Sequence, residues 1–160
     1  MNICEHLTVP ARLVPDREAL VFEGRRYSYR ELDALSVQAA DLLRRAGVTA
    51  GDRVALMLPN VPSFAVWYYA ALRLGGVALS ISTRSVGEEV AFVISDSGAR
   101  VLVADAKALA AVSGVIESEK IALFEVTEDA TGCNGVLLSE DQSLSSTWLA
   151  TEPDIPALIL

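Results

Sequence analysis

The chain has 160 residues, a formal net charge of −8 and a hydrophobic content of 52%. This length is enough for one domain with a substantial core, and the negative charge argues against a nucleic-acid or anionic-membrane surface. No apolar run reaches the roughly 18 residues of a membrane span, since Arg73 interrupts the run that follows Pro62. High hydrophobicity without a span predicts a large core together with apolar surface that other segments cover.

Residues 1–18 have the pattern of a peripheral arm, with a short helix near Cys4–Leu7. His6 in this arm could be a ligand or a base, but an incidental histidine is the simpler interpretation. Cys4 and Cys133 match no metal or redox motif, so we expect two reduced structural thiols of a cytoplasmic protein. The arm has no basic region followed by an apolar core, and a signal peptide is therefore not expected.

A small hairpin and a long helix come next. Ala19–Phe22 and Arg26–Tyr29 are predicted to pair, with Gly24 in the turn and the Arg25-Arg26 pair solvated beside it. Ser28 and Glu31 have the spacing of a capping box. The helix behind them has apolar residues at spacings of three and four before Gly47 ends it: Leu32, Leu35, Ala39, Leu42, Leu43 and Ala46.

Residues 53–82 form the unit around which the chain is organised: strand, helix, strand. Val54–Leu58 is entirely apolar, which is typical of a strand buried on both faces. Pro59 ends this strand, and Asn60 is predicted to cap a helix over Val61–Leu74. That helix is apolar nearly all round, so we expect it to be covered on more than one side, with Trp67 buried. A second strand is predicted at Val77–Ile81.

The same theme repeats downstream. Ser85 and Glu88 have the spacing of a second capping box, and the helix behind them is followed by a strand at Val101–Ala104. Asp105 is predicted to cap a short helix that Gly114 closes, and Ile121–Val126 is the next strand. Strand starts near residues 53, 77, 100 and 121 are spaced closely enough to predict β-α-β crossovers and a parallel sheet.

The pattern decays after residue 126. Val136–Leu138 is predicted as an edge strand, Trp148 as an anchor to the core, and Ala157–Leu160 as the opening of a buried strand. An apolar ending of this kind predicts a truncated chain.

From these elements together we expect a three-layer α/β fold, a largely parallel sheet flanked by helices, with a small N-terminal hairpin. Its single subdomain divides into an arm, a core and an irregular segment: 1–18, 19–126 and 127–160.

Five segments occur in an order and spacing that resemble a known family. They are Tyr27-Ser-Tyr-Arg-Glu-Leu32, Gly47-Val-Thr-Ala-Gly-Asp-Arg-Val54, Leu58-Pro-Asn60, Leu72-Arg-Leu-Gly-Gly-Val77 and Asp96-Ser-Gly-Ala-Arg-Val101. Together they are similar to the N-terminal part of the AMP-forming adenylating enzymes, which include acyl-CoA synthetases, peptide-synthetase adenylation domains and luciferases. The final residues 153–160 resemble the strand that leads into this family's phosphate loop.

The resemblance implies an ATP-dependent carboxylate–CoA ligase that forms an acyl-adenylate and then an acyl-CoA. In this family the phosphate loop, the nucleotide-binding motifs and a catalytic lysine follow the region matched here. We therefore expect ATP, Mg²⁺ and CoA to serve the full-length enzyme, with no catalytic residue and no metal ligand among residues 1–160. The expected partners are the remainder of the polypeptide and a carboxylic-acid substrate, and the isolated chain is expected to be inactive and to self-associate.

One site candidate lies within the match. The segment Leu79-Ser-Ile-Ser-Thr-Arg84 departs from the family pattern, because Ser80, Ser82 and Thr83 stand where proline, asparagine and proline are common. Arg84 itself fits the pattern. In some relatives this region lies near the CoA phosphates, which makes Arg84 the candidate cofactor-binding residue. The alternative is a solvated arginine before a helix.

Two other functions stay open at this point. A peptide-synthetase adenylation domain would share the first reaction step and differ in substrate and thiol acceptor. A self-standing flavodoxin-like binding module would have no chemistry of its own. The acyl pocket of the family lies downstream of the matched region, so residues 1–160 do not choose between the two kinds of adenylating enzyme.

Overall fold

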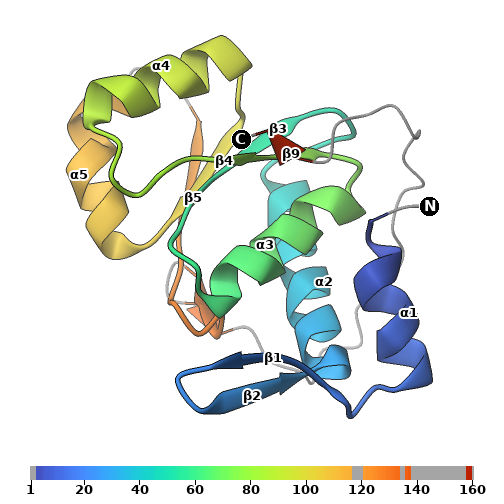
Figure 1. The fold of residues 1–160 in the computed structure, drawn as a ribbon. Helices are drawn as coiled ribbons and strands as arrows, with labels where there is room; N and C mark the ends of the chain where they lie inside the picture. Colours follow the sequence, from blue (N-terminus) through green and yellow to red (C-terminus); the bar gives the residue numbers. More distant parts are fainter. Residues whose placement is uncertain (1–2, 117–120, 134–135, 138–157, 160) are drawn as a thin grey trace.

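The computed structural model describes residues 3–116, 121–133, 136–137 and 158–159 (Figure 1). Its centre is a sheet of strand order β6-β5-β3-β4-β9 in which every neighbouring pair is parallel. The strands are β3 (Arg53–Met57), β4 (Val77–Ser80), β5 (Val101–Ala104), β6 (Ala122–Glu125) and β9 (Leu158–Ile159). The parallel sheet predicted from the strand–helix period is confirmed.

Helices cover both faces of this sheet. α1 (Glu5–Leu13), α2 (Tyr29–Arg45) and α3 (Pro62–Arg73) lie on one face, and α4 (Gly87–Ser97) and α5 (Ala106–Ile116) lie on the other (Figure 1). Alternate residues of β3 explain the two layers, because successive side chains of a strand point to opposite faces. Val54 and Leu56 join the core under α2 and α3, whereas Ala55 and Met57 join the core under α4 and α5. The three-layer α/β architecture is therefore confirmed.

The predicted strands are in place with small shifts at their ends. Arg53 joins β3 because it pairs with Val77 of β4, and Val101–Ala104 matches its prediction fully. Residues 158–159 of the predicted C-terminal strand form β9, which pairs with β4 at one end of the strand order. Trp148 and Leu138 lie outside the described residues.

A separate hairpin packs beneath the helices. It consists of β1 (Glu18–Phe22) and β2 (Arg25–Ser28), joined through Glu23 and Gly24. Both turn residues have positive φ, +48° and +83°, which matches the twist of a tight two-residue hairpin. A second small antiparallel pair links β7 (Gly132–Cys133) with β8 (Val136–Leu137), so the predicted edge strand at 136 joins this pair and not the central sheet.

The helix ends show where local patterns compete with tertiary contacts. The capping box of α2 is confirmed: Glu31 N–H donates to Ser28 Oγ and Ser28 N–H donates to Glu31 Oε2, both at 3.2 Å. The predicted Asn60 cap is wrong. Val61 is the N-cap of α3, and the Ser63 N–H donates instead to the backbone oxygen of Glu128, 3.2 Å away. A segment distant in sequence thus provides the acceptor that Asn60 was expected to supply.

Three further expectations about helix ends need correction. α4 begins at Gly87, and Glu89 rather than Glu88 accepts from the N–H of its N-cap, Val86, at 3.1 Å. α5 is capped by Asp105 as predicted, through the Ala108 N–H at 2.7 Å, but it continues past Gly114 to Ile116, the last described residue before 121. α1 extends to Leu13 and contains Pro10, so the arm is a packed helix with Cys4 and Leu7 buried.

Candidate functional site

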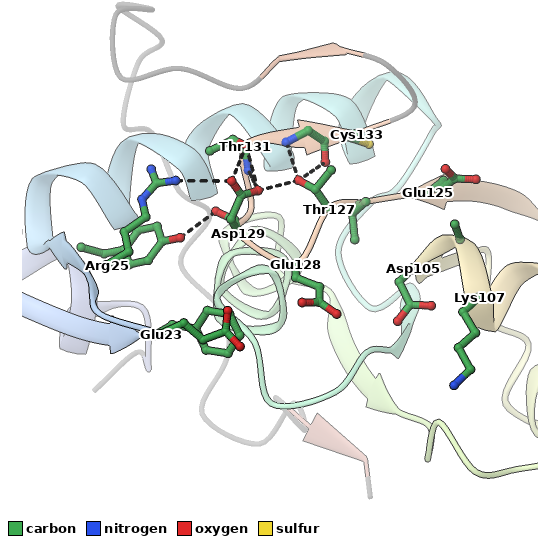
Figure 2. A pocket seen from close by; sticks show the side chains of 15 residues that line it. Glu23, Arg25, Asp105, Lys107, Glu125, Thr127, Glu128, Asp129, Thr131 and Cys133 are labelled. Atoms are coloured by element: carbon green, nitrogen blue, oxygen red, sulfur yellow. Dashed lines mark hydrogen bonds and ion pairs between the residues drawn. The ribbon is translucent and has the colours of Figure 1, made fainter.

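A hollow of about 970 Å³ lies over the carboxyl ends of β5 and β6 (Figure 2). Its walls are the β1–β2 hairpin, the start of α5 and the segment from Glu125 to Cys133. In open parallel α/β sheets, ligands bind outside the carboxyl ends of the strands, near the point where the strand order reverses. The order here reverses at β3, which has β4 on one side and β5 on the other. The hollow therefore lies at the ligand-binding edge of the sheet, but over the strands next to the reversal point and not over β3 itself.

The charged side chains that line this hollow are mainly acidic. Its carboxylates outnumber its two cationic side chains, Arg25 and Lys107; the carboxylates belong to Glu23, Asp105, Glu125, Glu128 and Asp129. A negative lining repels polyphosphates and attracts cations or hydroxyl donors. Asp105 is already engaged as the cap of α5. The hollow is thus a poor site for the phosphates of a nucleotide.

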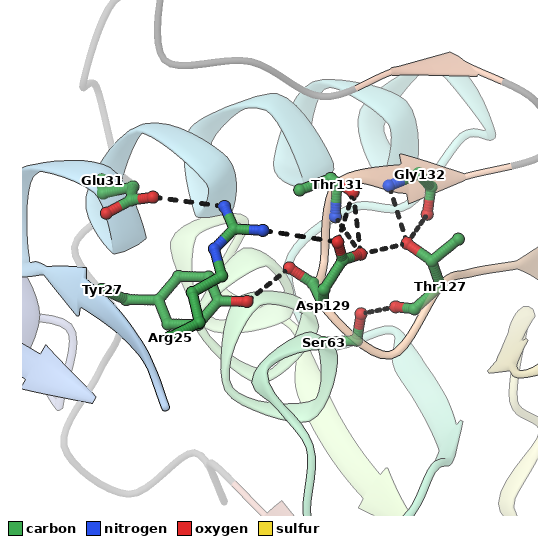
Figure 3. A network of polar contacts seen from close by, with 8 residues as sticks. All are labelled: Arg25, Tyr27, Glu31, Ser63, Thr127, Asp129, Thr131 and Gly132. Atoms are coloured by element: carbon green, nitrogen blue, oxygen red, sulfur yellow. Dashed lines mark hydrogen bonds and ion pairs between the residues drawn. The ribbon is translucent and has the colours of Figure 1, made fainter. Parts of the chain in front are cut away.

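Asp129 is the centre of a polar network in one wall (Figure 3). Its carboxylate accepts hydrogen bonds from Thr127 Oγ1 at 2.7 Å, from Thr131 Oγ1 at 2.8 Å and from the Thr131 N–H at 3.1 Å. Burial raises the pKa of Asp129, but the hydrogen bonds from Thr127 and Thr131 and the charge of Arg25 outweigh it and lower the pKa overall. The Asp129 side chain is therefore ionised at neutral pH.

The same network connects the turn to the hairpin and to α2. Arg25 lies 3.4 Å from both Asp129 and Glu31, and its guanidinium stacks 4.6 Å from the centroid of the Tyr27 ring (Figure 3). The Tyr27 hydroxyl donates to the backbone oxygen of Asp129 at 3.0 Å. Arg25 is exposed, as expected of a solvated residue, and it also bridges two segments that lie far apart in the sequence.

A further contact connects the turn to α3. The Ser63 hydroxyl donates to the backbone oxygen of Thr127, next to the bond from the Ser63 N–H to Glu128. The segment 127–132 therefore joins the hairpin, the start of α2 and the start of α3. We call it the 127–132 latch.

The sequence-predicted site residues lie elsewhere. Arg84 is exposed in the turn between β4 and α4, where its backbone N–H donates to Ser82 Oγ at 3.2 Å. It is not part of the lining of the acidic hollow. His6 is exposed on α1. Neither Arg84 nor His6 therefore lines the hollow.

Both cysteines are buried, and neither is in a disulfide. Burial raises the pKa of Cys4 to about 11 and that of Cys133 to about 12. Both thiols are consequently protonated at neutral pH, which is the wrong state for a nucleophile or a metal ligand. Among the residues that the structure describes, no group of three or more potential ligands is placed to hold a metal ion.

Sequence reasoning missed the latch. The signal was present in Thr127-Glu-Asp-Ala-Thr131, where an aspartate has a threonine two residues away on each side. Such residues hydrogen-bond neighbouring backbone and hydroxyl groups in tight turns. The pattern does not, however, reveal that Arg25 and Tyr27 meet this turn from more than 100 residues away in sequence.

The fold is that of the N-terminal domain of adenylate-forming enzymes. The AMP-binding enzyme family matches residues 7–159, and the chain belongs to this family. A solved fatty acyl-CoA synthetase of Mycobacterium tuberculosis superposes with a TM-score of 0.75 and 29% identity, covering 94% of this chain and 30% of that one. A benzoate–CoA ligase of Burkholderia xenovorans has a TM-score of 0.85 at 20% identity, covering 99% and 32%, and supports the fold alone.

Curated relatives are similar over part of the chain. A long-chain-fatty-acid–CoA ligase of Mycobacterium tuberculosis is 44% identical over 78 residues, covering 49% of this chain and 16% of the relative. A 3-hydroxybenzoate–CoA/4-hydroxybenzoate–CoA ligase of Thauera aromatica is 36% identical over 94 residues, covering 59% and 18%. The chain thus spans less than a fifth of the length of either relative in these matches. In the part of the chain that the structure describes, no helix is long and apolar enough to cross a membrane.

Proposed function

We propose that the chain is the N-terminal part of an ATP-dependent carboxylate–CoA ligase. The observation that carries this proposal is the family match over residues 7–159, together with relatives whose names are CoA ligases of fatty and aromatic acids. In the first step a carboxylate oxygen attacks the α-phosphorus of ATP and pyrophosphate leaves. In the second step the CoA sulfur attacks the acyl carbon and AMP leaves.

Within this function, residues 1–160 supply scaffold and not catalysis. Charge that builds on the phosphates must be met by preorganised donors or cations, and the acidic hollow offers the opposite potential. Among the described residues, no three or more carboxylates, histidines or cysteines are grouped to hold a metal ion, which supports a Mg²⁺ site elsewhere in the polypeptide. ATP and Mg²⁺ would therefore be bound by the remainder of the polypeptide, which would also hold CoA apart from the Arg84 contact proposed below, and the 160-residue chain by itself would be inactive.

The test is carboxylate-dependent exchange of labelled pyrophosphate into ATP. The complete natural protein is assayed with Mg²⁺ and a panel of short, medium, long and aromatic acids, beside the 160-residue chain. We expect exchange from the complete protein and none from the chain, since losing even one oxyanion donor typically costs about 10²–10³ in rate. Exchange by the 160-residue chain would overturn the claim that residues 1–160 supply only scaffold. Absence of exchange by the complete protein with every acid would overturn the ligase proposal.

We also propose that Arg84 interacts with the phosphates of CoA. Its side chain is exposed beyond the carboxyl end of β4, and among the described residues no salt bridge engages it. Arg84→Ala in the complete protein should raise KM for CoA several-fold while pyrophosphate exchange is unchanged. Arg44→Ala, which removes an exposed arginine of α2, is the matched control. Equal effects of the two variants on KM would contradict this role.

A peptide-synthetase adenylation domain is the second candidate. A fused adenylation–carrier di-domain from Klebsiella oxytoca superposes with a TM-score of 0.67 and 25% identity over 76% of this chain. Supplying CoA or a carrier-protein thiol to the preformed adenylate distinguishes the two acceptors. A stand-alone binding module without chemistry would show neither exchange nor thioester formation. We further propose that the protein is cytoplasmic. We also propose that the isolated chain self-associates, which light scattering tests directly.

A further inference from the structure

A buried ion pair connects α2 with α3 on the face where α1 packs. Arg73 is 2% exposed, and its guanidinium pairs with the Asp33 carboxylate and donates from Nε to Ser36 Oγ at 2.9 Å. The remaining nitrogen, Nη1, is buried without a hydrogen-bond partner. Such an unsatisfied buried donor has a free-energy cost, because it gives up hydration without replacing it.

The N-terminal end of α1 lies beside this pair. Cys4 is 1% exposed, and the charges of Arg73 and Asp33 both act on its thiol. Leu7 and Thr8 are the buried residues within α1 itself. The buried face of α1 is therefore short, and its N-terminal end lies close to the Arg73–Asp33 pair.

The helix is weakly held in itself. Its N-cap, Cys4, makes no side-chain capping hydrogen bond, and Pro10 lies inside the helix, where it has no N–H to donate to the preceding turn. Large apolar side chains on α1 point to solvent: Val9 is 45% exposed and Leu13 is 76% exposed. Docking therefore uses only part of the apolar surface of this helix.

The segment that follows α1 is, by contrast, firmly attached. The Tyr29 N–H donates to Arg17 O and the Arg30 N–H donates to Pro15 O, both at 3.0 Å. These two bonds hold residues 15–17 against the start of α2. They place a fixed pivot directly behind the last turn of α1.

We infer that α1 is a detachable strap, which opens at residue 14, ahead of the anchored residues 15–17, while the rest of the domain stays folded. Opening hydrates the Arg73 guanidinium, including the donor that lacks a partner when α1 is docked, and this gain offsets part of the lost burial of Cys4 and Leu7. The inference goes beyond the proposed ligase function and does not depend on it. It assigns a local, sub-global motion to this end of the molecule.

The experiment measures opening at Cys4 by peptide-resolved thiol alkylation, beside hydrogen–deuterium exchange of α2. It uses the complete natural protein, with the 160-residue chain in parallel. A buried thiol reacts only when it becomes exposed, so the Cys4 rate reports the open fraction of α1. We expect Cys4 to react at least about tenfold faster than global opening allows, with little dependence on urea below the unfolding transition. A Cys4 rate that follows the exchange of the α2 core amides at every urea concentration would overturn the strap.

A double variant tests the cause. The double variant Asp33→Leu with Arg73→Met replaces the pair by apolar residues and removes the unsatisfied donor. It should slow Cys4 alkylation about tenfold, because proteins in which apolar groups replace a buried ion pair are often more stable. Arg44→Met, in an exposed ion pair of α2, is the control and should leave the rate unchanged. An unchanged or faster Cys4 rate in a folded double variant would contradict the assigned cause. If the double variant does not fold, the urea dependence of the wild-type rate still decides the motion.

Discussion

The hydroxyl of Tyr27 donates a 3.0 Å hydrogen bond to the backbone oxygen of Asp129, 102 positions further along the chain. The Tyr27 side chain is fully buried, and its ring lies under the Arg25 guanidinium. This bond fixes the distance between the β1–β2 hairpin and the 127–132 latch, which both line the acidic hollow. The shape of the hollow therefore depends on a contact that neither segment forms by itself.

Tyr27→Phe should destabilise the domain by about 1–2 kcal/mol. The substitution keeps the ring but leaves the Asp129 carbonyl without its donor, and a lost hydrogen bond with one partner left behind costs about this much. Urea unfolding followed by circular dichroism gives the difference. Tyr29→Phe, in the first turn of α2, serves as the matched control, and an equal effect of both variants would argue against the assigned role of the Tyr27 hydroxyl.

Asp129→Asn should loosen the latch more than the fold. The side chain accepts from two threonines and pairs with Arg25, but it is 44% exposed, so we expect a loss of only about 1–2 kcal/mol. Hydrogen exchange at Thr131 and Gly132 should accelerate, whereas exchange in β3 should not. Asp16→Asn, which alters an 86% exposed partner of Arg30, should change neither. Faster exchange throughout the sheet would contradict a local latch.

The contribution of Asp129 should disappear in acid. Its pKa is lowered in the folded state, so the folded protein binds a proton there less readily than the unfolded chain. The stabilisation is therefore fully present above the unfolded pKa of about 3.9 and is lost as the pH falls through the lower folded value. The difference in unfolding free energy between wild type and Asp129→Asn should be constant near neutral pH and shrink below about pH 4. A difference that changes between pH 5 and 8 would show that another group is responsible.

Trp67→Ala should cost about 3–5 kcal/mol, the usual range for emptying a large aromatic site. Trp67 is fully buried in α3, with its ring centroid 5.3 Å from that of Phe124 on β6. Trp67→Phe should cost clearly less, because it retains an aromatic ring and removes an indole N–H that has no hydrogen-bond partner in the structure. The exposed Phe92→Ala is the control. A shift below about 1 kcal/mol for Trp67→Ala would show that the site is not part of the packed core.

The sequence by itself determined the layers of this protein and the order of its elements. Uniformly apolar segments such as Val101–Ala104 are typical of strands buried on both faces, and their short spacing predicts helical crossovers. The Ser28–Glu31 box also formed as predicted, because all its atoms lie within one turn of chain. Local periodicity and local hydrogen bonding are properties of neighbouring residues, which a sequence displays directly.

Only the tertiary structure decided which distant polar groups meet. Arg25 is exposed as expected, but its pairing with Asp129 was not predicted. Asn60 was expected to cap α3, yet the backbone oxygen of Glu128 accepts the hydrogen bond in its place. Arg73, which interrupts an apolar run, is buried because Asp33 and Ser36 of another helix receive its guanidinium. A charge or a capping group takes whichever partner gives the lower free energy once the chain is compact. That choice depends on distances between elements, which are set by packing and are not written in any local pattern.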